Sequence, residues 1–158
     1  PFGNTVATLE LTGADVVAAL ENSVSAINLN DDGQISRDGA SGRFLQVSGL
    51  TYSFDPTLES GSRIVSVEVE QEDGSFAAID ESAVYLVAMP NFIANGGDGY
   101  DIFVEAGMNV YLFGRVDWEV TRDYMQTLTP INNDDGISAD DDTPRIIAVN
   151  AEVAPRAE

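Results

Sequence analysis

A segment from Asn91 to Tyr100 (NFIANGGDGY) holds the side chains best suited to chemistry. Three of the four residues from 96 to 99 are glycines, which permit positive φ and let another group approach the main chain closely. Asp98 lies among them, where its carboxylate could accept hydrogen bonds from a sugar diol. The alternative is a sharp turn in which Asp98 bonds its own loop. Phe92 also has two interpretations, a core residue or a platform for a ligand.

Two acidic loops indicate a second kind of chemistry, the binding of a cation. Residues 28–35 (NLNDDGQI) resemble the start of a calcium loop, which makes Asn28, Asn30 and Asp32 candidate calcium ligands. Position 1 is Asn rather than Asp, however, and Gly39 stands at position 12, where a bidentate Glu is needed. Residues 132–142 form the second loop and hold five aspartates. The alternative for both loops is a solvated acidic insertion.

The charge and the missing residue types exclude several classes of function. The chain has 158 residues, with 27 Asp and Glu against 7 Lys and Arg, and a formal net charge of -20. All the basic residues are Arg, and His and Cys are absent, so there is no Ser-His-Asp triad, zinc finger, disulfide or thiolate chemistry. The negative charge argues against nucleic acid and anionic membranes as partners. No apolar run approaches the length of a membrane span.

The spacing of apolar residues predicts the elements that position these side chains. Residues 5–11 alternate with the period of a strand, and Thr12 with Asp15 is typical of a helix start. Helical spacing then continues to Ile27, and a second helix is predicted from Asp117. The other predicted strands cover residues 44–47, 50–54, 64–70, 76–79, 84–89 and 146–149.

These elements indicate the α+β class, with a mixed sheet and two main helices. The length fits one domain, which is predicted to cover residues 1–149. Residues 150–158 show no periodicity and are predicted to form a tail. The chain starts at Pro1 rather than Met, which predicts a processed protein or an excised fragment.

Several segments resemble, in order, the C-terminal domain of the 5'-nucleotidases, a family that includes bacterial UDP-sugar hydrolases and animal ecto-5'-nucleotidases. Residues 1–4 (PFGN) resemble its PFGN or PFGG element, residues 42–50 (GRFLQVSGL) its GxFLQVSG element, and residues 91–100 its NFxANGGDGY element. Shorter matches are LTG at residues 11–13, GSRI at 61–64, and GRVD at 114–117 together with Tyr124. Together these matches cover nearly the whole chain, and the ANGGDG element is very specific.

The resemblance implies a substrate-specificity domain that recognises the base and ribose of a nucleotide. Phe2 and Phe92 would sandwich the base, because a flat ring flanked on both sides gains stacking energy. Asp98 would accept hydrogen bonds from the ribose hydroxyls, and Asn4 would contact the base. The implied substrate-binding residues are Phe2, Asn4, Phe92, Gly96, Gly97 and Asp98.

The resemblance also implies that the reaction itself occurs outside these residues. The family's phosphate-binding arginines lie upstream, in and before an NGGGIR element. Its two-metal centre lies further upstream, in a metallophosphoesterase domain built from Asp, Asn and His. A chain without His cannot contain that centre, so we expect no catalytic residue and no cofactor here, and two divalent metal ions in the upstream domain. The fragment alone is expected to be inactive and to lack the first part of its domain.

The predicted parent is a periplasmic or extracellular hydrolase of the 5'-nucleotidase type, which removes phosphate from nucleotides or cleaves UDP-sugars or cyclic nucleotides. Its predicted partners are a nucleoside or nucleotide substrate and the upstream metallophosphoesterase domain, with no nucleic acid and no membrane span. Two other hypotheses stay open: a non-catalytic binding or cell-surface module that retains the fold, and a calcium-stabilised structural domain. An Asp-x-His element and an Asn-His-Asp or Asn-His-Glu element before this segment would favour the enzyme.

Overall fold

A computed structural model describes residues 2–36, 42–128 and 144–155. The chain divides into two compact units. The first unit consists of the segment up to Leu11 and the segment from Val84 to Pro144. The second unit consists of Thr12–Ala83 and the segment from Arg145 onward. Each unit is built on a sheet of its own, one with three strands and one with four.

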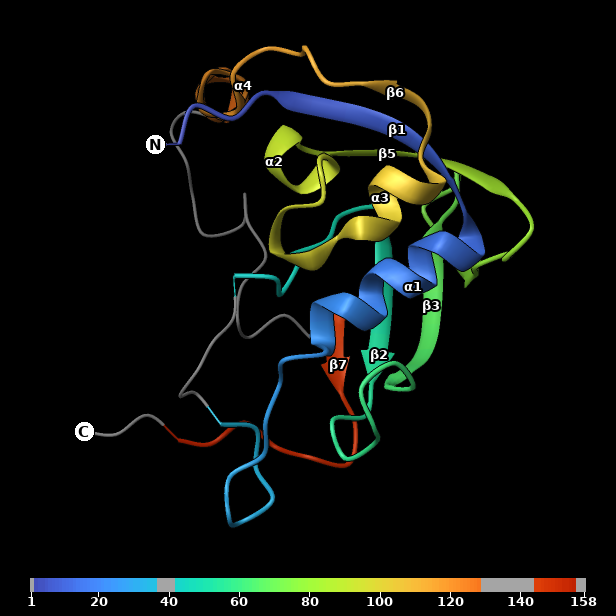
Figure 1. Ribbon diagram of the computed structural model, residues 1–158, viewed down its shortest axis with the longest axis vertical. Helices are drawn as coiled ribbons and strands as arrows, with labels where there is room; N and C mark the ends of the chain where they lie inside the picture. The colour runs from blue at the N-terminus through green and yellow to red at the C-terminus, as the bar shows by residue number, and fades with distance from the viewer. Residues whose placement is uncertain (1, 37–41, 129–143, 156–158) are drawn as a thin grey trace. The chain divides into compact units, whose positions relative to one another are not determined.

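The second unit contains the four-stranded sheet, in the order β4-β3-β2-β7. β2 (Leu50–Phe54), β3 (Ile64–Glu70) and β4 (Phe76–Ala78) are antiparallel neighbours. β7 (Ile146–Ala148) pairs in parallel with β2, so this sheet is mixed, as the sequence predicts. α1 (Gly13–Val24) packs against the sheet (Figure 1). The buried apolar residues of α1, β2 and β3 are Val16, Ala19, Leu20, Val24, Tyr52, Phe54 and Val67.

The start of α1 is fixed by the capping pair that the sequence predicts. The Thr12 hydroxyl accepts a hydrogen bond from the Asp15 N–H, and the Asp15 carboxylate accepts one from the Thr12 N–H, both at 3.2 Å. The Gly13 N–H donates to the Ala83 carbonyl at 3.0 Å. A Cβ atom on Gly13 would overlap the main chain of Asp80, so glycine is required for this close approach.

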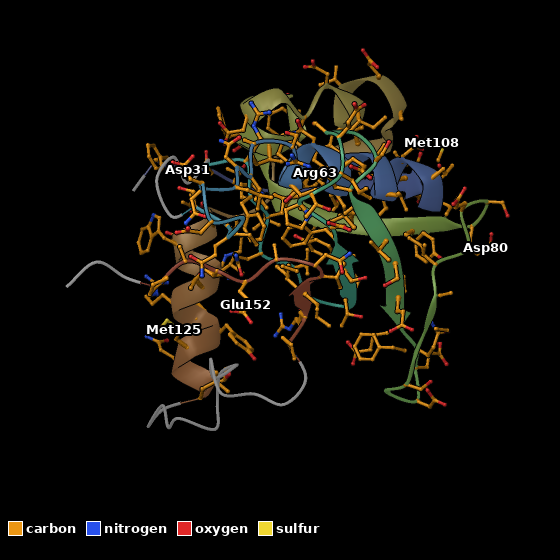
Figure 2. All side chains as sticks on the ribbon, turned by 90° about the horizontal axis from the view of Figure 1, so that it is seen from below. Asp31, Arg63, Asp80, Met108, Met125 and Glu152 are labelled. Atoms are coloured by element: carbon orange, nitrogen blue, oxygen red, sulfur yellow. The ribbon has the colours of Figure 1, made fainter. Side chains whose placement is uncertain are left out.

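The end of α1 is held by Arg63 (Figure 2). Its guanidinium donates to the carbonyls of Val24, Ser25 and Ile27 at 2.7, 3.2 and 2.9 Å. The Glu21 carboxylate in turn accepts the N–H of Arg63 at 3.0 Å. The last carbonyls of a helix have no donor within the helix, and here the guanidinium of Arg63, from another segment, donates to carbonyls at the helix end. The helix therefore ends at Val24 rather than continuing to Ile27 as predicted.

The first unit contains the three-stranded sheet, in the order β5-β1-β6. β1 (Val6–Thr12) is the central strand, β5 (Val84–Pro90) lies on one side, and β6 (Met108–Tyr111) lies on the other (Figure 1). Every second residue of β1 is buried, as the alternation in the sequence predicts. The core of this unit comprises Ala7, Leu9, Leu11, Ile93, Ala94, Tyr100 and Phe103.

Three short helical segments follow β5 in the first unit. They are α2 (Asn91–Ala94), the 3₁₀ turn η1 (Gly97–Gly99) and α3 (Asp101–Ala106). α4 (Asp117–Thr127) comes after β6 and lies beside the beginning of β1 (Figure 1). None of its residues is buried. Over the part of the chain that the structure describes, no helix has the length and apolar character needed to cross a membrane.

The α+β class is confirmed, and α1 and α4 are the two main helices that the sequence predicts, with 12 and 11 residues. Residues 44–47 form no strand, which corrects the prediction. Their main chain is held by side chains instead: the Leu45 N–H donates to Ser23 Oγ at 2.8 Å, and the Val47 carbonyl accepts from Arg145 at 2.5 Å. The glycine-rich segment contains the short turn η1.

Candidate functional site

Phe92 projects from the first turn after β5. Pro90 is the last residue of β5, and its extended main chain (φ -61°, ψ 139°) precedes the start of α2. Ile93 and Ala94, the two residues after Phe92, are buried in the first unit and anchor α2. Phe92 itself is 51% exposed. It is therefore not a buried core residue, and its ring is accessible to a ligand.

Gly97 provides the surface on which the Phe92 ring rests. A Cβ atom built on Gly97 would lie 2.5 and 2.6 Å from the ring atoms Cε1 and Cζ of Phe92, and 2.6 Å from its carbonyl oxygen. Real Cβ atoms do not approach other heavy atoms so closely, so the ring occupies this position only because residue 97 is glycine. The Phe92 ring and the Phe92 carbonyl thus occupy the space that a side chain at position 97 would need.

Gly96 and Asp98 both adopt the left-handed conformation, with φ of 87° and 55°. The Gly96 N–H donates to the Ile93 carbonyl at 2.9 Å, an arrangement typical of a helix end. Aspartate is among the few residues other than glycine that adopt this conformation. The Asp98 side chain is exposed, on the turn that follows Phe92. Its carboxylate can accept hydrogen bonds from two hydroxyl groups of a ribose.

Phe2 and Asn4 lie just before β1 in the same unit. Phe2 is fully exposed, so its ring does not pack against the segment that holds Phe92 and Asp98. Gly3 has a φ of 72°, and Asn4 is half-buried. The Asn4 carbonyl accepts a hydrogen bond from the N–H of Asp117, the first residue of α4, at 2.9 Å. The structure therefore brings four of the predicted residues into one segment and places Phe2 and Asn4 on a neighbouring one.

Two hydrogen bonds join these two segments. The Asn91 N–H donates to the Thr5 carbonyl at 2.9 Å, and the Thr5 N–H donates to Asn91 Oδ1 at 3.1 Å. Thr5 directly follows Asn4, and Asn91 directly precedes Phe92. In the sequence Asn91 is only the first residue of the NF motif. Its bond to Thr5 could not be predicted, since no local pattern relates two positions separated by 86 residues.

The candidate calcium loop in the second unit is closed by its own hydrogen bonds. Asn30 Oδ1 accepts from the N–H groups of Asp32 at 3.1 Å and Gln34 at 2.8 Å. The Ser36 N–H donates to the Asn28 carbonyl at 2.8 Å. Nowhere in residues 2–36, 42–128 and 144–155 do three or more His, Cys, Asp or Glu side chains form a group suited to a metal ion. The calcium site stays a prediction, and the second acidic loop at 132–142 lies outside the described residues.

Comparisons with known proteins identify the family. The model of the 5'-nucleotidase C-terminal domain matches residues 1–105. The trifunctional nucleotide phosphoesterase protein YfkN of Bacillus subtilis is 35% identical over 81% of this chain, and an apyrase of Tabanus yao is 33% identical over 83%. The crystal structure of a 5'-nucleotidase precursor from Thermus thermophilus is 40% identical, covers 95% of this chain, and superposes with a TM-score of 0.78.

This chain spans only part of each relative. It corresponds to 8% of the Bacillus protein, 23% of the Tabanus apyrase and 26% of the Thermus chain. The region that the family model matches includes every predicted substrate-binding residue, namely Phe2, Asn4, Phe92, Gly96, Gly97 and Asp98. The chain belongs to the family of 5'-nucleotidase C-terminal domains.

Proposed function

We propose that this chain recognises the base and ribose of a nucleotide on behalf of a hydrolase of the 5'-nucleotidase type. The observation that supports this most is the exposed Phe92, whose ring rests against Gly97 and which is followed by the exposed residue Asp98. A base stacked on an aromatic ring gains about 1–3 kcal/mol. A carboxylate next to such a ring is suited to the paired hydroxyls of the ribose.

Phe2 supplies the second ring of this proposed site. Thr5, three residues later in the chain, is bonded to Asn91 next to Phe92. Three peptide units span at most about 11 Å, so the segment is long enough to bring Phe2 over a base that lies on Phe92. Asn4 would then contact the edge of the base. Because stacking does not depend on a particular set of hydrogen bonds, this arrangement accepts more than one base.

Phosphate cleavage is assigned to residues outside this chain. The sequence has no His and no Cys, and the described residues hold no cluster of carboxylates suited to a metal. They therefore do not fit the two-metal centre that the family implies. We place the two divalent ions and the phosphate-binding arginines in an upstream part of the full-length protein, and expect the present chain alone to be inactive. The net charge of -20 agrees with binding of the uncharged base and ribose here.

The proposed location of the protein is the periplasm or the outside of the cell. The support comes from relatives such as the snake venom 5'-nucleotidase of Gloydius brevicauda, which is 30% identical over 81% of this chain. Cell fractionation followed by immunodetection of the full-length protein would test this. Recovery of the protein from the cytoplasm alone would contradict it.

Substitution of Phe92→Ala in the full-length protein tests the proposed function. We expect KM for adenosine 5'-monophosphate to rise about tenfold or more, because a stacked base is lost. KM for ribose 5-phosphate, which has no base, should stay unchanged. Phe76→Ala is the matched control, because Phe76 is also an exposed phenylalanine but lies on β4 in the second unit.

An unchanged KM for the nucleotide in Phe92→Ala would refute the stacking role. A full-length protein that binds adenosine through Phe92 but hydrolyses no nucleotide would support the non-catalytic binding module instead. Steady-state kinetics and calorimetric titration with adenosine, performed on the same samples, distinguish these outcomes.

A further inference from the structure

Asn91 uses three of its polar groups where the two proposed ring-bearing segments meet. Its N–H donates to the Thr5 carbonyl, and its side-chain oxygen accepts the Thr5 N–H. Its own carbonyl accepts from the N–H and the side-chain amide of Asn95, at 3.0 and 2.7 Å, within α2 and its C-terminal cap. Asn91 therefore bonds to the strand segment that follows Phe2 and to the short helix that contains Phe92.

The segment before β1 has a separate set of bonds to the chain that follows β6. The Thr5 hydroxyl donates to the Leu112 carbonyl at 2.7 Å, and the Val6 N–H donates to the Arg115 carbonyl at 2.9 Å. The Asn4 carbonyl accepts from the N–H of Asp117. These bonds hold the segment in the fold without Asn91. The segment therefore has several bonds that do not involve Asn91, and the Asn91 side chain adds one between this segment and the start of α2.

We propose that Asn91 is a positioning residue that sets the separation of the Phe2 and Phe92 rings for a nucleobase. This inference rests on the proposed function. A base between two rings needs about 7–8 Å between them, twice the usual contact distance of carbon atoms. Ile93 and Ala94 anchor the buried side of α2, and the main-chain bond between Thr5 and Asn91 holds its first residue. The second bond, to Asn91 Oδ1, adds a restraint at the residue next to Phe92 and so narrows the range of directions that Phe92 can take.

The acceptor role of Asn91 Oδ1 allows a sharp test in the full-length protein. Asn91→Leu keeps the approximate size of the side chain and removes the acceptor, whereas Asn91→Asp keeps an acceptor in the same place. We expect Asn91→Leu to raise KM for adenosine 5'-monophosphate about three- to tenfold, the effect of one hydrogen bond, with kcat unchanged. KM for ribose 5-phosphate should stay within about twofold in both variants, because it has no base to stack. Asn91→Asp should stay close to wild type for both substrates.

Asn95→Ala is the matched control. It removes an amide side chain that bonds to the Asn91 carbonyl and leaves both bonds to Thr5 intact. An increase in KM equal to that of Asn91→Leu would show that the stability of α2, rather than its orientation, matters, and would overturn the inference. So would equal effects of Asn91→Leu on both substrates, or equal effects of the Leu and Asp variants. If Asn91→Leu does not fold, Asn91→Ser, whose shorter side chain does not reach the Thr5 N–H, replaces it.

The outcome for Phe92→Ala separates the inference from the proposed function. If Phe92→Ala raises KM for the nucleotide and Asn91→Leu does not, only the positioning role is refuted. If neither variant changes KM, the proposed function itself fails. Inhibition by adenosine gives a second readout that depends on the base and not on phosphate hydrolysis, and it should weaken in parallel with the rise in KM.

Discussion

In the second unit, charged side chains bond to the main chain, whereas the first unit leaves many apolar side chains exposed. Arg63 donates to four carbonyls, and Glu21 accepts the N–H groups of Arg63 and Ile64. In the first unit, by contrast, large exposed side chains occur on β5, β6 and α4 and in the segments beside them. They include Leu86, Phe92, Tyr111, Phe113, Trp118, Tyr124 and Met125.

From this difference we infer that the side chains of the second unit contribute mainly to stability, and the exposed side chains of the first unit to ligand recognition. Side chains that satisfy buried or half-buried main-chain groups stabilise the unit that contains them, and their loss leaves those groups without partners. Exposed aromatic rings add little to folding but provide a surface for a ligand. We therefore expect substitutions in the second unit to lower the free energy of unfolding, and substitutions at the Phe92 site to change nucleotide binding.

Arg63→Ala should have the largest effect on stability. It removes the donor to the carbonyls at the end of α1, and we expect the free energy of unfolding to fall by about 2–4 kcal/mol. KM for nucleotides in the full-length protein should change little at temperatures where the variant is folded. Denaturant titration followed by circular dichroism measures the free energy of unfolding.

Arg122→Ala is the control for Arg63→Ala. Arg122 is exposed on α4, where it pairs with Asp123 and lies 5.2 Å from the Trp118 ring. Exposed ion pairs contribute little to stability, so we expect almost no change in the free energy of unfolding. If Arg122→Ala destabilised the protein as much as Arg63→Ala, the contrast between the two units would be wrong.

Gly97→Ala should weaken nucleotide binding because the added methyl group displaces the Phe92 ring. We expect an increase in KM comparable to that of Phe92→Ala, about tenfold. A double-mutant cycle measures how much of this effect depends on the ring. Phe92→Ala removes the overlap with the ring but not the overlap with the carbonyl oxygen of residue 92, so the further change Gly97→Ala should have a smaller effect than in the wild type. Additive effects of the two substitutions would mean that the ring contact does not contribute to the effect of Gly97→Ala.

Acid should destabilise the second unit because Asp55 becomes protonated, and we expect this loss of stability to be small. The Thr57 hydroxyl and the Asn150 side-chain amide donate to its carboxylate and hold the pKa of Asp55 below its usual value. A lowered folded pKa contributes stability above the unfolded pKa, about 3.9, and this contribution is lost as the pH falls through the folded pKa.

Asp55→Asn tests the acid effect. The melting temperature of the wild-type protein should fall more steeply below about pH 4 than that of the variant, because the variant has no carboxylate to protonate. Thermal melts in a series of buffers measure this. Two curves with the same slope would show that Asp55 does not contribute to the pH dependence.

Local patterns in the sequence predict the elements whose structure depends on nearby residues. The alternation in β1 and the capping pair of Thr12 and Asp15 both occur as predicted. The strand predicted at residues 44–47 does not form, because Ser23 and Arg145, distant in the sequence, bond its main chain. Apolar alternation contains no information about such partners.

Prediction of the candidate site from the sequence is limited in the same way. The glycines and Asp98 indicate a tight turn, and the turn is present. That Phe92 is exposed rather than buried does not follow from its residue type, since it depends on Ile93 and Ala94 filling the core. The bonds between Thr5 and Asn91 join positions 86 residues apart and could not be predicted from either segment alone.

The contact between Gly97 and the Phe92 ring also constrains how the family can change over evolution. Any side chain at position 97 would overlap both the ring and the carbonyl oxygen of residue 92, so a larger residue there requires a different main-chain path as well as a different side chain at position 92. A homologue with a side chain at position 97 should therefore differ in the conformation of the whole turn, and not only in the ring that the turn carries.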